Sequence, residues 1–231
     1  MPRILKQFIY GIVYLFVFGI IIFNFFNPKE KTQKEEIPVF KPIEILGEVE
    51  RLSLSSGRTV FLAEIRNPND ARGANRTPYK FLVYGRSGNL IEELTGEKNL
   101  KPLQRVYVYE PDINSLDKDI YRVQLTLGVP EWVSREELTP EFVVKDAQTD
   151  VLQNSIKVRG IIENKSPINA RGIRVLAILR NGYNIDLFAS ETFVEGVRGF
   201  EEKAFSVSFP EDKALLANVE PKNTKIFYIS E

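Results

Sequence analysis

The sequence predicts an all-β fold: an N-terminal transmembrane helix followed by two tandem immunoglobulin-like β-sandwich domains. Three observations lead to this prediction. Residues 8–26 are one apolar run, the chain after residue 42 alternates apolar and polar side chains, and its two halves are similar to each other. A period of two is typical of half-buried strands, whereas a long uncharged run is typical of a membrane helix.

The apolar run FIYGIVYLFVFGIIIFNFF, residues 8–26, contains no charged residue. As a helix at roughly 1.5 Å per residue it would be about 28 Å long, close to the ~30 Å of a bilayer core. We interpret it as a signal anchor. A cleaved signal peptide fits less well, because the run is longer than a usual apolar region and no small-residue cleavage site follows it. Residues 1–7 are then a short tail, and residues 27–41 a charged, solvated linker.

The orientation of the anchor is only weakly specified, because Lys and Arg nearly balance on its two flanks. A tail of seven residues before a first apolar segment usually stays inside. We therefore predict a single-pass protein of the cell membrane, held in the lipid bilayer by residues 8–26, with its C-terminal domains outside the cytoplasm.

An internal repeat divides the rest of the chain. Residues 60–67 align with 157–164, residues 81–89 with 175–183, and residues 108–112 with 208–212. Ser87-Gly88 and Asn181-Gly182 mark equivalent hairpin turns. We predict domains at 42–129 and 139–231, joined by an interdomain linker at 130–138. Each copy is long enough to bury a core of its own.

Helical periods after the linker are short. The two candidate helices are residues 134–138 and residues 212–217. Neither exceeds two turns, so they do not change the predicted fold class.

One segment of the first copy carries a family signature. Phe81-Leu82-Val83-Tyr84-Gly85, followed by a Gly turn, resembles the FxLYD domain family, which is related in pattern to the water-stress domains of late-embryogenesis-abundant proteins. Val83 replaces the family's Leu and Gly85 its Asp, and the equivalent residues 175–182 have lost both aromatic side chains. The resemblance implies an immunoglobulin-like sandwich, often tethered to bacterial envelope membranes, without a catalytic centre. It carries over no functional residue.

Composition excludes several kinds of chemistry. The chain has no Cys and no His, so disulfides, thiolate metal sites and Ser–His or Cys–His nucleophiles cannot form. Lys plus Arg equals Asp plus Glu, at 31 each, and no basic stripe indicates nucleic-acid binding. We predict no catalytic residue, no metal, no cofactor and no small-molecule substrate.

The repeated motif Asn…Ala-Arg-Gly is the best shared candidate for an interaction site, with Asn67, Arg72, Asn164 and Arg171. The two arginines could bind a carboxylate-bearing partner. The preferred interpretation is structural, with Asn holding a turn and Arg solvated at a sheet edge. Trp132, the only Trp, is expected to pack at the junction of the two domains.

Acidic segments offer weaker candidates. Residues 112–119 are rich in oxygen ligands, but the EF-hand spacing fails after Asn114 and the required Gly is missing. The adjacent pairs at 92–93 and 201–202 would point to opposite faces of a strand, which makes them poor acid–base pairs.

These observations predict a non-catalytic, membrane-anchored envelope protein whose sandwiches serve as a scaffold or interaction module for an envelope partner. Exposed strand edges are natural pairing sites for such a partner. One alternative is a stress-protective protein of the water-stress type. The other is an enzyme that relies on carboxylate or Lys chemistry.

Overall fold

The computed structural model describes residues 2–26, 40–114, 120–134 and 140–230. Its contacts divide the chain into two units, residues 1–39 and residues 40–231. The first unit contains the helix α1, Arg3–Phe26, so helix already begins within the tail expected at residues 1–7. Within the described part of the chain, no helix is both long enough and apolar enough to cross a membrane.

The second unit is built almost entirely of strands. Its first half contains seven of them: β1 Glu44–Ser53, β2 Arg58–Arg66, β3 Arg72–Gly85, β4 Leu90–Leu100, β5 Arg105–Asn114, β6 Ile120–Leu127 and β7 Glu131–Ser134. Its second half contains β8 Phe142–Val151, β9 Ile156–Asn164, β10 Ala170–Arg180, β11 Asp186–Val197, β12 Glu202–Ser208, α2 Lys213–Asn218, a 3-10 turn at Pro221–Asn223, and β13 Lys225–Ser230.

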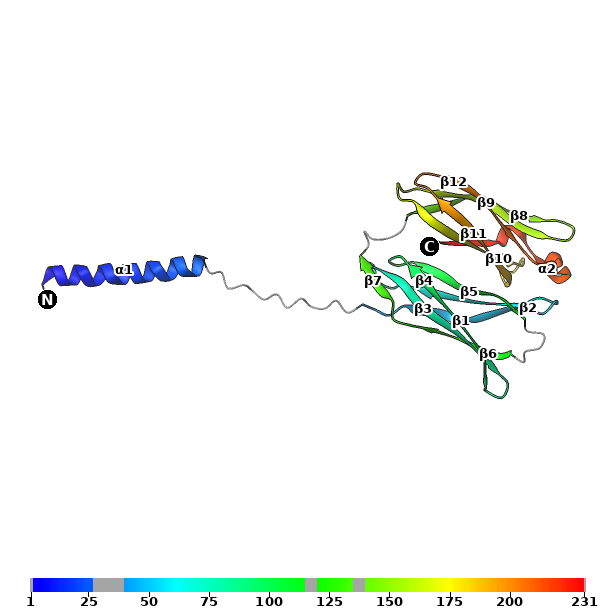
Figure 1. Ribbon diagram of the computed structural model, residues 1–231, viewed down its shortest axis with the longest axis horizontal. Coiled ribbons are helices and arrows are strands. Elements are labelled where there is room, and N and C mark those ends of the chain that lie inside the picture. The colour runs from blue at the N-terminus through cyan, green and yellow to red at the C-terminus, as the bar shows by residue number, and fades with distance from the viewer. Residues whose placement is uncertain (1, 27–39, 115–119, 135–139, 231) are drawn as a thin grey trace. The chain divides into compact units, whose positions relative to one another are not determined.

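The two halves have the same sheet topology. In the first half, sheet 1 has the order β1-β2-β5 and sheet 2 the order β4-β3-β6, with β7 added beside β3. In the second half, sheet 3 is β12-β9-β8 and sheet 4 is β11-β10-β13, and all pairings are antiparallel. The all-β prediction with sandwich-like sheets is confirmed (Figure 1). The division into two domains stays a prediction, since residues 40–231 group as one compact unit.

Strand register corrects one part of the repeat alignment. Arg66 pairs with Arg105 in the first half, and Glu163 pairs with Glu202 in the second. This makes Val108 the equivalent of Phe205, whereas the alignment of 108–112 with 208–212 matched Val108 to Ser208, three residues further on. The sequence match there follows the shared Pro and Asp, which do not occupy equivalent strand positions.

Both halves protect the same edge strand with a bulge. The register of β1 shifts between Leu46 and Glu50, and that of β8 between Lys145 and Gln148. Gly47 and Asp146 have positive φ in these bulges, at 79° and 49°. A bulge twists an edge strand and interrupts its row of unpaired backbone groups, which discourages edge-to-edge aggregation.

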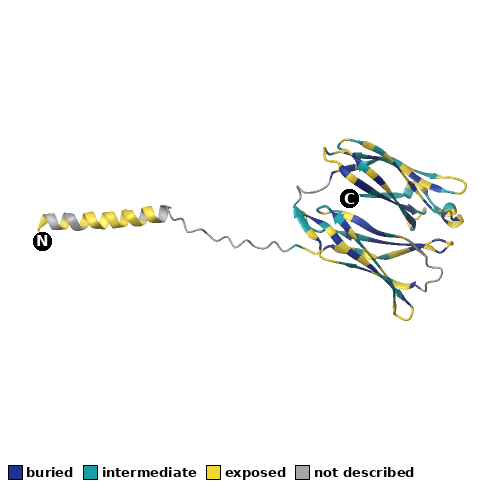
Figure 2. Ribbon diagram, in the orientation of Figure 1, coloured by how far each residue is buried: buried dark blue, intermediate teal, exposed yellow. Residues whose placement is uncertain are grey.

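The buried side chains form two clusters, one within the first half and one that spans both halves. Phe61, Ala63 and Ile65 of β2 point into a core between sheets 1 and 2. The alternate residues Val60 and Leu62 point the other way, into a cluster that contains the entire core of the second half. Sheet 1 is therefore covered on both faces. The first copy buries a core of its own between sheets 1 and 2, and the core of the second copy continues onto the other face of sheet 1 (Figure 2).

The second half meets sheet 1 through sheet 4. The ring of Phe227 on β13 packs against Tyr107 on β5 with centroids 4.7 Å apart, and Tyr109 donates to the Ala189 carbonyl at 3.3 Å. Strand β10 is buried on both faces from Val175 to Leu179, as a strand between two apolar layers must be. Apolar runs without alternation, at 60–63 and 175–179, are the sequence signal of this arrangement.

Asp212 ties the halves together at one end of the interface. Its carboxylate accepts a hydrogen bond from the Ser55 backbone N–H at 3.0 Å, and it caps α2 by accepting from Leu215 N–H at 2.9 Å. The expected helix at 212–217 is thus confirmed as α2. The other candidate, 134–138, overlaps the end of β7 at Ser134, and its remainder lies outside the described residues.

Candidate functional site

A polar cleft of about 580 Å³ lies where the two halves meet, and we call it the junction cleft. Strands β3, β4 and β5 supply one wall, and β10, β11 and β13 supply the other. Its charged lining residues are Arg76, Glu97, Lys98, Glu110, Arg174 and Glu191. Concave sites at the meeting of two packed bodies are common ligand sites, which makes this cleft the leading candidate.

Tyr79 organises the first wall. It lies opposite Gly96 in the β3–β4 register, and a Cβ at Gly96 would come within 2.3 Å of the Tyr79 hydroxyl oxygen. The missing side chain at Gly96 thus makes room for the phenol, which donates to Glu110 Oε1 at 2.8 Å. Burial raises the pKa of Glu110, while the hydrogen bond from Tyr79 and the charge of Lys98 act against this rise. Burial and the Glu110 charge raise the pKa of Tyr79.

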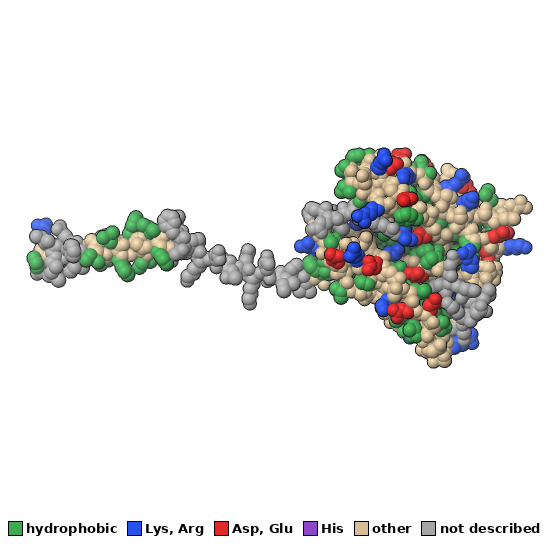
Figure 3. Space-filling view, in the orientation of Figure 1, with side chains coloured by type: hydrophobic (Ala, Val, Ile, Leu, Met, Phe, Trp, Pro, Cys, Tyr) green, Lys and Arg blue, Asp and Glu red, His purple; other side chains and the backbone are tan. Residues whose placement is uncertain are grey.

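An ion pair organises the second wall. Arg174 of β10 donates to Glu191 of β11 with the two charged atoms 2.9 Å apart, and the Arg174 guanidinium also lies 5.7 Å from the Phe193 ring centroid. The cleft therefore presents neighbouring charges of opposite sign. Figure 3 shows the same mixture of acidic and basic side chains across the visible face of the unit. Such a lining suits a polar ligand that carries both donors and acceptors, such as a peptide segment.

The rim of the cleft is shaped by a bulge in β3. The register shifts between Ala74 and Thr77, and Arg76 adopts a positive φ of 45° there. Its backbone N–H donates to the Asn99 side-chain oxygen at 2.8 Å, which holds the bulge in place. The bulge presents the Arg76 side chain, which is exposed, at the mouth of the cleft.

The sequence-predicted residues lie elsewhere. Asn67 and Asn164 are fully buried at the ends of β2 and β9. Asn67 donates to the carbonyls of Arg72 and Lys101 at 2.8 and 3.1 Å and accepts from the backbone of Asn69 at 3.0 Å. Their amides hold turns, so neither side chain faces a partner.

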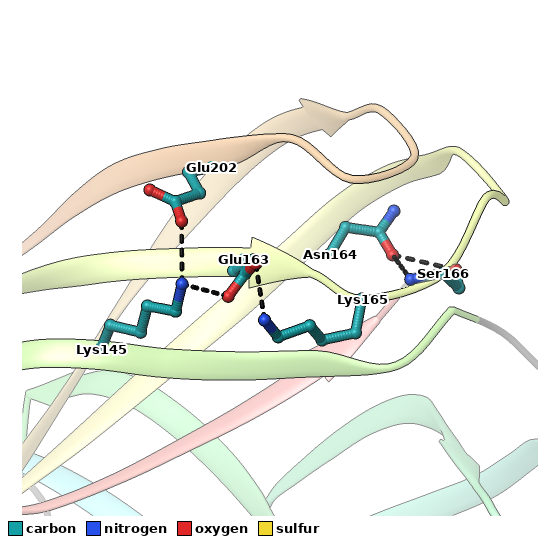
Figure 4. Close-up of polar contacts among 6 residues, drawn as sticks. All are labelled: Lys145, Glu163, Asn164, Lys165, Ser166 and Glu202. Carbon is teal, nitrogen blue, oxygen red and sulfur yellow. Dashed lines mark hydrogen bonds and ion pairs between the residues drawn. The ribbon is translucent and has the colours of Figure 1, made fainter.

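Asn164 makes the equivalent bonds in the second half. It donates to the Ile168 carbonyl at 2.7 Å. Its side-chain oxygen accepts from the N–H of Ser166 at 3.0 Å (Figure 4). Beside it Glu163 pairs with Lys165 at 2.7 Å and with Lys145, which also reaches Glu202 at 2.8 Å. The hydrogen bonds from Lys145 and Lys165 lower the pKa of Glu163. These charges lie on sheet 3, and none of them lines the junction cleft.

The two arginines and Trp132 do not converge. Arg72 is half-buried at the start of β3, with its guanidinium 5.8 Å from the Phe40 ring centroid, and Arg171 is exposed near the start of β10. Trp132 lies in β7, opposite Ala74, with its ring 5.2 Å from Phe40. It packs on the core of the first half, so the expectation that it fills the junction of the halves is wrong. Residues 131–134, expected in a linker, extend sheet 2.

No metal site is found among the described residues, in the sense of three or more acidic side chains gathered to hold an ion. The oxygen-rich segment 112–119 lies largely outside the described residues. The residues of the junction cleft carried no sequence signal. Tyr79 and Glu110 are separated by 31 positions, and the match of 108–112 with 208–212 did not single out Glu110 as a site residue.

Comparisons with known proteins add little. No protein-family model matches the chain, and no curated protein matches it. Among solved structures, it is similar to the crystal structure of red sea bream transglutaminase, with 11% identity and a TM-score of 0.30. The match covers 87% of this chain and 34% of the transglutaminase chain, so the protein spans about a third of that chain's length. A TM-score this low carries no argument about fold or activity.

Proposed function

We propose that the protein is a non-catalytic, single-pass membrane protein whose tandem immunoglobulin-like sandwiches act outside the cytoplasm as an interaction scaffold. The observation that carries the proposal is the junction cleft, lined by neighbouring charges of opposite sign and walled by two halves that share one apolar cluster. A cleft walled by two halves that pack against each other through a shared cluster is preorganised for a partner, which lowers the cost of binding.

The charged groups of the cleft support a binding role over a catalytic one. Glu110 is engaged by Tyr79, and Glu191 is engaged by Arg174. A catalytic carboxylate needs a reacting atom within reach, whereas these oxygens are already held by donors. The absence of His and Cys from the sequence removes the commonest nucleophile systems.

The membrane part of the proposal is supported by the sequence of residues 8–26, which carries no charge and is helical within α1. Because the structure describes no spanning helix, localisation is the first thing to test.

The test uses the full chain with a C-terminal tag in intact cells. We expect the tag to remain with carbonate-washed membranes and to be lost when protease is added outside the cells. A variant with Val13→Glu and Val17→Lys should lose membrane retention, whereas the matched surface variant Val129→Glu should keep it. If protease added outside intact cells leaves the tag in place, the proposed orientation is wrong. If carbonate releases the unaltered chain from the membranes, the proposed anchor is wrong.

The binding role is tested separately by placing a photoreactive residue at Arg76, at the mouth of the cleft, and at Arg86, in the β3–β4 hairpin. We expect a discrete adduct in cells from position 76 only, and we expect Glu191→Lys to abolish it. Equal adducts at both positions would show that the cleft has no special role.

A further inference from the structure

Two turns, one in each half, place a bulky apolar residue where glycine or asparagine is usual. Residues 101–104 and 198–201 connect β4 to β5 and β11 to β12. Each is closed by a backbone hydrogen bond from its fourth residue to its first, at 3.2 and 3.1 Å. The third residues, Leu103 and Phe200, have φ of 57° and 60°. Positive φ at that place is the pattern of a type II turn, which favours Gly or Asn.

The turns do not need these side chains. Their backbones are held by hydrogen bonds that any residue would make: Leu103 N–H donates to the Asn69 carbonyl at 3.0 Å, and Phe200 N–H donates to the Ser166 carbonyl at 3.1 Å. Side-chain caps come from the neighbouring Gln104 and Glu201, which accept from the first N–H of each turn. Leu103 is 54% exposed and Phe200 69% exposed, so packing does not account for them either.

Both turns lie at one end of the unit, and it is the end that carries Lys41, close to the first described residue of the unit, Phe40. Lys41 exchanges two hydrogen bonds with the Asn69 side chain, at 3.0 and 2.9 Å, and Asn69 holds the Leu103 turn. We call this the entry end, and we call Leu103 and Phe200 the entry-end tips. In Figure 1 the β4–β5 and β11–β12 connections lie on this side of the unit.

A series of hydrogen bonds links the two turns across the entry end. Lys101 donates to the Pro140 carbonyl at 2.8 Å, and the neighbouring Glu141 carbonyl accepts from Lys165 N–H at 2.7 Å. Lys165 directly precedes Ser166, which holds the Phe200 turn. Ile168, another exposed apolar residue, lies in the same loop as Ser166.

We propose that the entry-end tips insert their apolar side chains into the surface of the lipid bilayer that holds residues 8–26, an inference that rests on the proposed membrane anchor. Strained, exposed residues that the fold does not require indicate a function, and here the strain recurs in both halves. The partner must accept apolar side chains at the end where the chain enters.

The bilayer satisfies that condition. Residues 27–39 can extend at most about 45 Å, at roughly 3.5 Å per residue, so the entry end stays close to the membrane that holds residues 8–26. A tether of this length gives a high effective concentration, so insertion of two side chains suffices even though it would be weak for a free protein. Insertion would hold the junction cleft at a defined height above the lipid.

The test uses the full-length chain in phosphatidylcholine vesicles. The sequence has no Cys, so a single Cys introduced for a fluorophore is unique. Labels are placed at Asp70→Cys and Pro167→Cys, in the loops that support the two tips, at Tyr183→Cys in the hairpin at the opposite end, and at Phe16→Cys in the anchor. Lipids with a nitroxide near the headgroup quench fluorophores that lie at the bilayer surface, and lipids with a nitroxide near the end of the acyl chain quench the label at position 16.

We expect the fluorophores at positions 70 and 167 to be quenched at least severalfold more strongly than the fluorophore at position 183. The double variant Leu103→Asn, Phe200→Asn should abolish this difference, and the matched variant Leu90→Asn should leave it unchanged. Quenching at 16 without quenching at 70 and 167 would contradict the insertion of the entry-end tips while supporting the membrane anchor. Quenching at 70 and 167 that survives the double variant would also overturn them, since the tether alone would then explain it. Absence of quenching at 16 would overturn the anchor and the tips together.

A second measurement separates this role from a structural one. Asparagine tolerates positive φ, so the double variant should melt at a higher temperature than the unaltered chain. A lower melting temperature would show that the fold needs Leu103 and Phe200, and would overturn the proposal.

Discussion

Asn67 and Asn164 each use both ends of the amide inside a turn. In each case the NH₂ group donates to at least two carbonyls and the oxygen accepts from a residue two positions later. These carbonyls belong to different loops, so one side chain joins the β2–β3 connection to β4–β5, or the β9–β10 connection to β11–β12. A buried amide with all its partners is stabilising, whereas its loss leaves several backbone groups unpaired.

We expect Asn164→Ala to lower the free energy of unfolding by about 2 kcal/mol or more, because the carbonyls of Ile168, Val197 and Arg198 lose the buried amide that donates to them. Urea denaturation of the full chain measures the change. Asn218→Ala is the matched control, since its amide bonds the Ala214 carbonyl at the exposed surface of α2. Equal effects of the two substitutions would show that the buried network contributes nothing special.

Glu50 is a second residue whose role follows from its neighbours. It lies on β1 and faces Asp186 on β11, across the interface between the halves. Burial, the charge of Asp186 and a hydrogen bond with Asp186 raise the pKa of Glu50, while Arg180 and Lys225 act against the rise. The folded chain therefore binds this proton more tightly than the unfolded chain does.

Stability should consequently fall as the pH rises from the usual carboxyl range through the raised pKa of Glu50. We expect Glu50→Gln to raise the melting temperature near pH 7 and to flatten its dependence on pH. Thermal melts between pH 4 and 8 measure this, with Glu48→Gln on the same strand as the control. A lower melting temperature for Glu50→Gln at pH 7 would contradict the expected direction.

At the scale of the element, strands β9 and β12 show how alternation selects a face. Val158 and Val207 are direct cross-strand partners and are fully buried, while their neighbours Lys157 and Ser208 form an exposed pair. A shift of one residue would exchange the two faces, so the apolar pattern specifies the register.

Val158→Asp should destabilise the chain by about 3 kcal/mol or more, because it buries a charge with no partner. Circular dichroism during thermal unfolding measures the loss. Lys157→Asp, on the solvent face of the same strand, should change stability little. A small effect of Val158→Asp would mean that this face of β9 is not buried.

At the scale of the whole molecule, the second unit depends on an interface that neither half can cover alone. Sheet 1 presents Leu62, Tyr107 and Tyr109 to the second half, and sheet 4 presents Phe227 in return. Separating the halves would expose these side chains to water, which is costly. The unit is therefore expected to unfold cooperatively, despite its repeated topology.

We expect residues 40–231 to unfold in a single calorimetric transition. Leu62→Ala should lower the free energy of unfolding by about 3 kcal/mol, and the transition should remain single. Hydrogen exchange should accelerate in both β3 and β10, which belong to different halves. Phe81→Ala, inside the first half, serves as the comparison. Two separate transitions would show that the halves fold independently.

Local features were the most predictable from the sequence. Alternating runs predicted β6, β9 and β12, the Ser-Gly and Asn-Gly pairs marked equivalent hairpins, and Asn67 and Asn164 were expected to hold turns. Each of these depends on a few neighbouring residues and on the two-residue period of a strand. The junction cleft and the entry-end tips were not predictable in this way. Tyr79, Glu110, Arg174 and Glu191 come from four strands, and Leu103 and Phe200 share only a backbone conformation.

The amino-acid pattern alone was sufficient to establish the all-β class, the repeated order of strands, the turns and the exclusion of His and Cys chemistry, because these depend on composition and short-range periodicity. The folded arrangement was needed to show that the core of the second copy extends onto sheet 1 of the first, that β7 joins sheet 2, and that a cleft of paired charges forms at the junction. Val60 and Leu62 are as apolar as Phe61 and Ala63, and a sequence does not say which surface an apolar face will cover. That depends on the contact between two sheets distant in the chain, and it was settled here by the fit of sheet 1 against sheet 4.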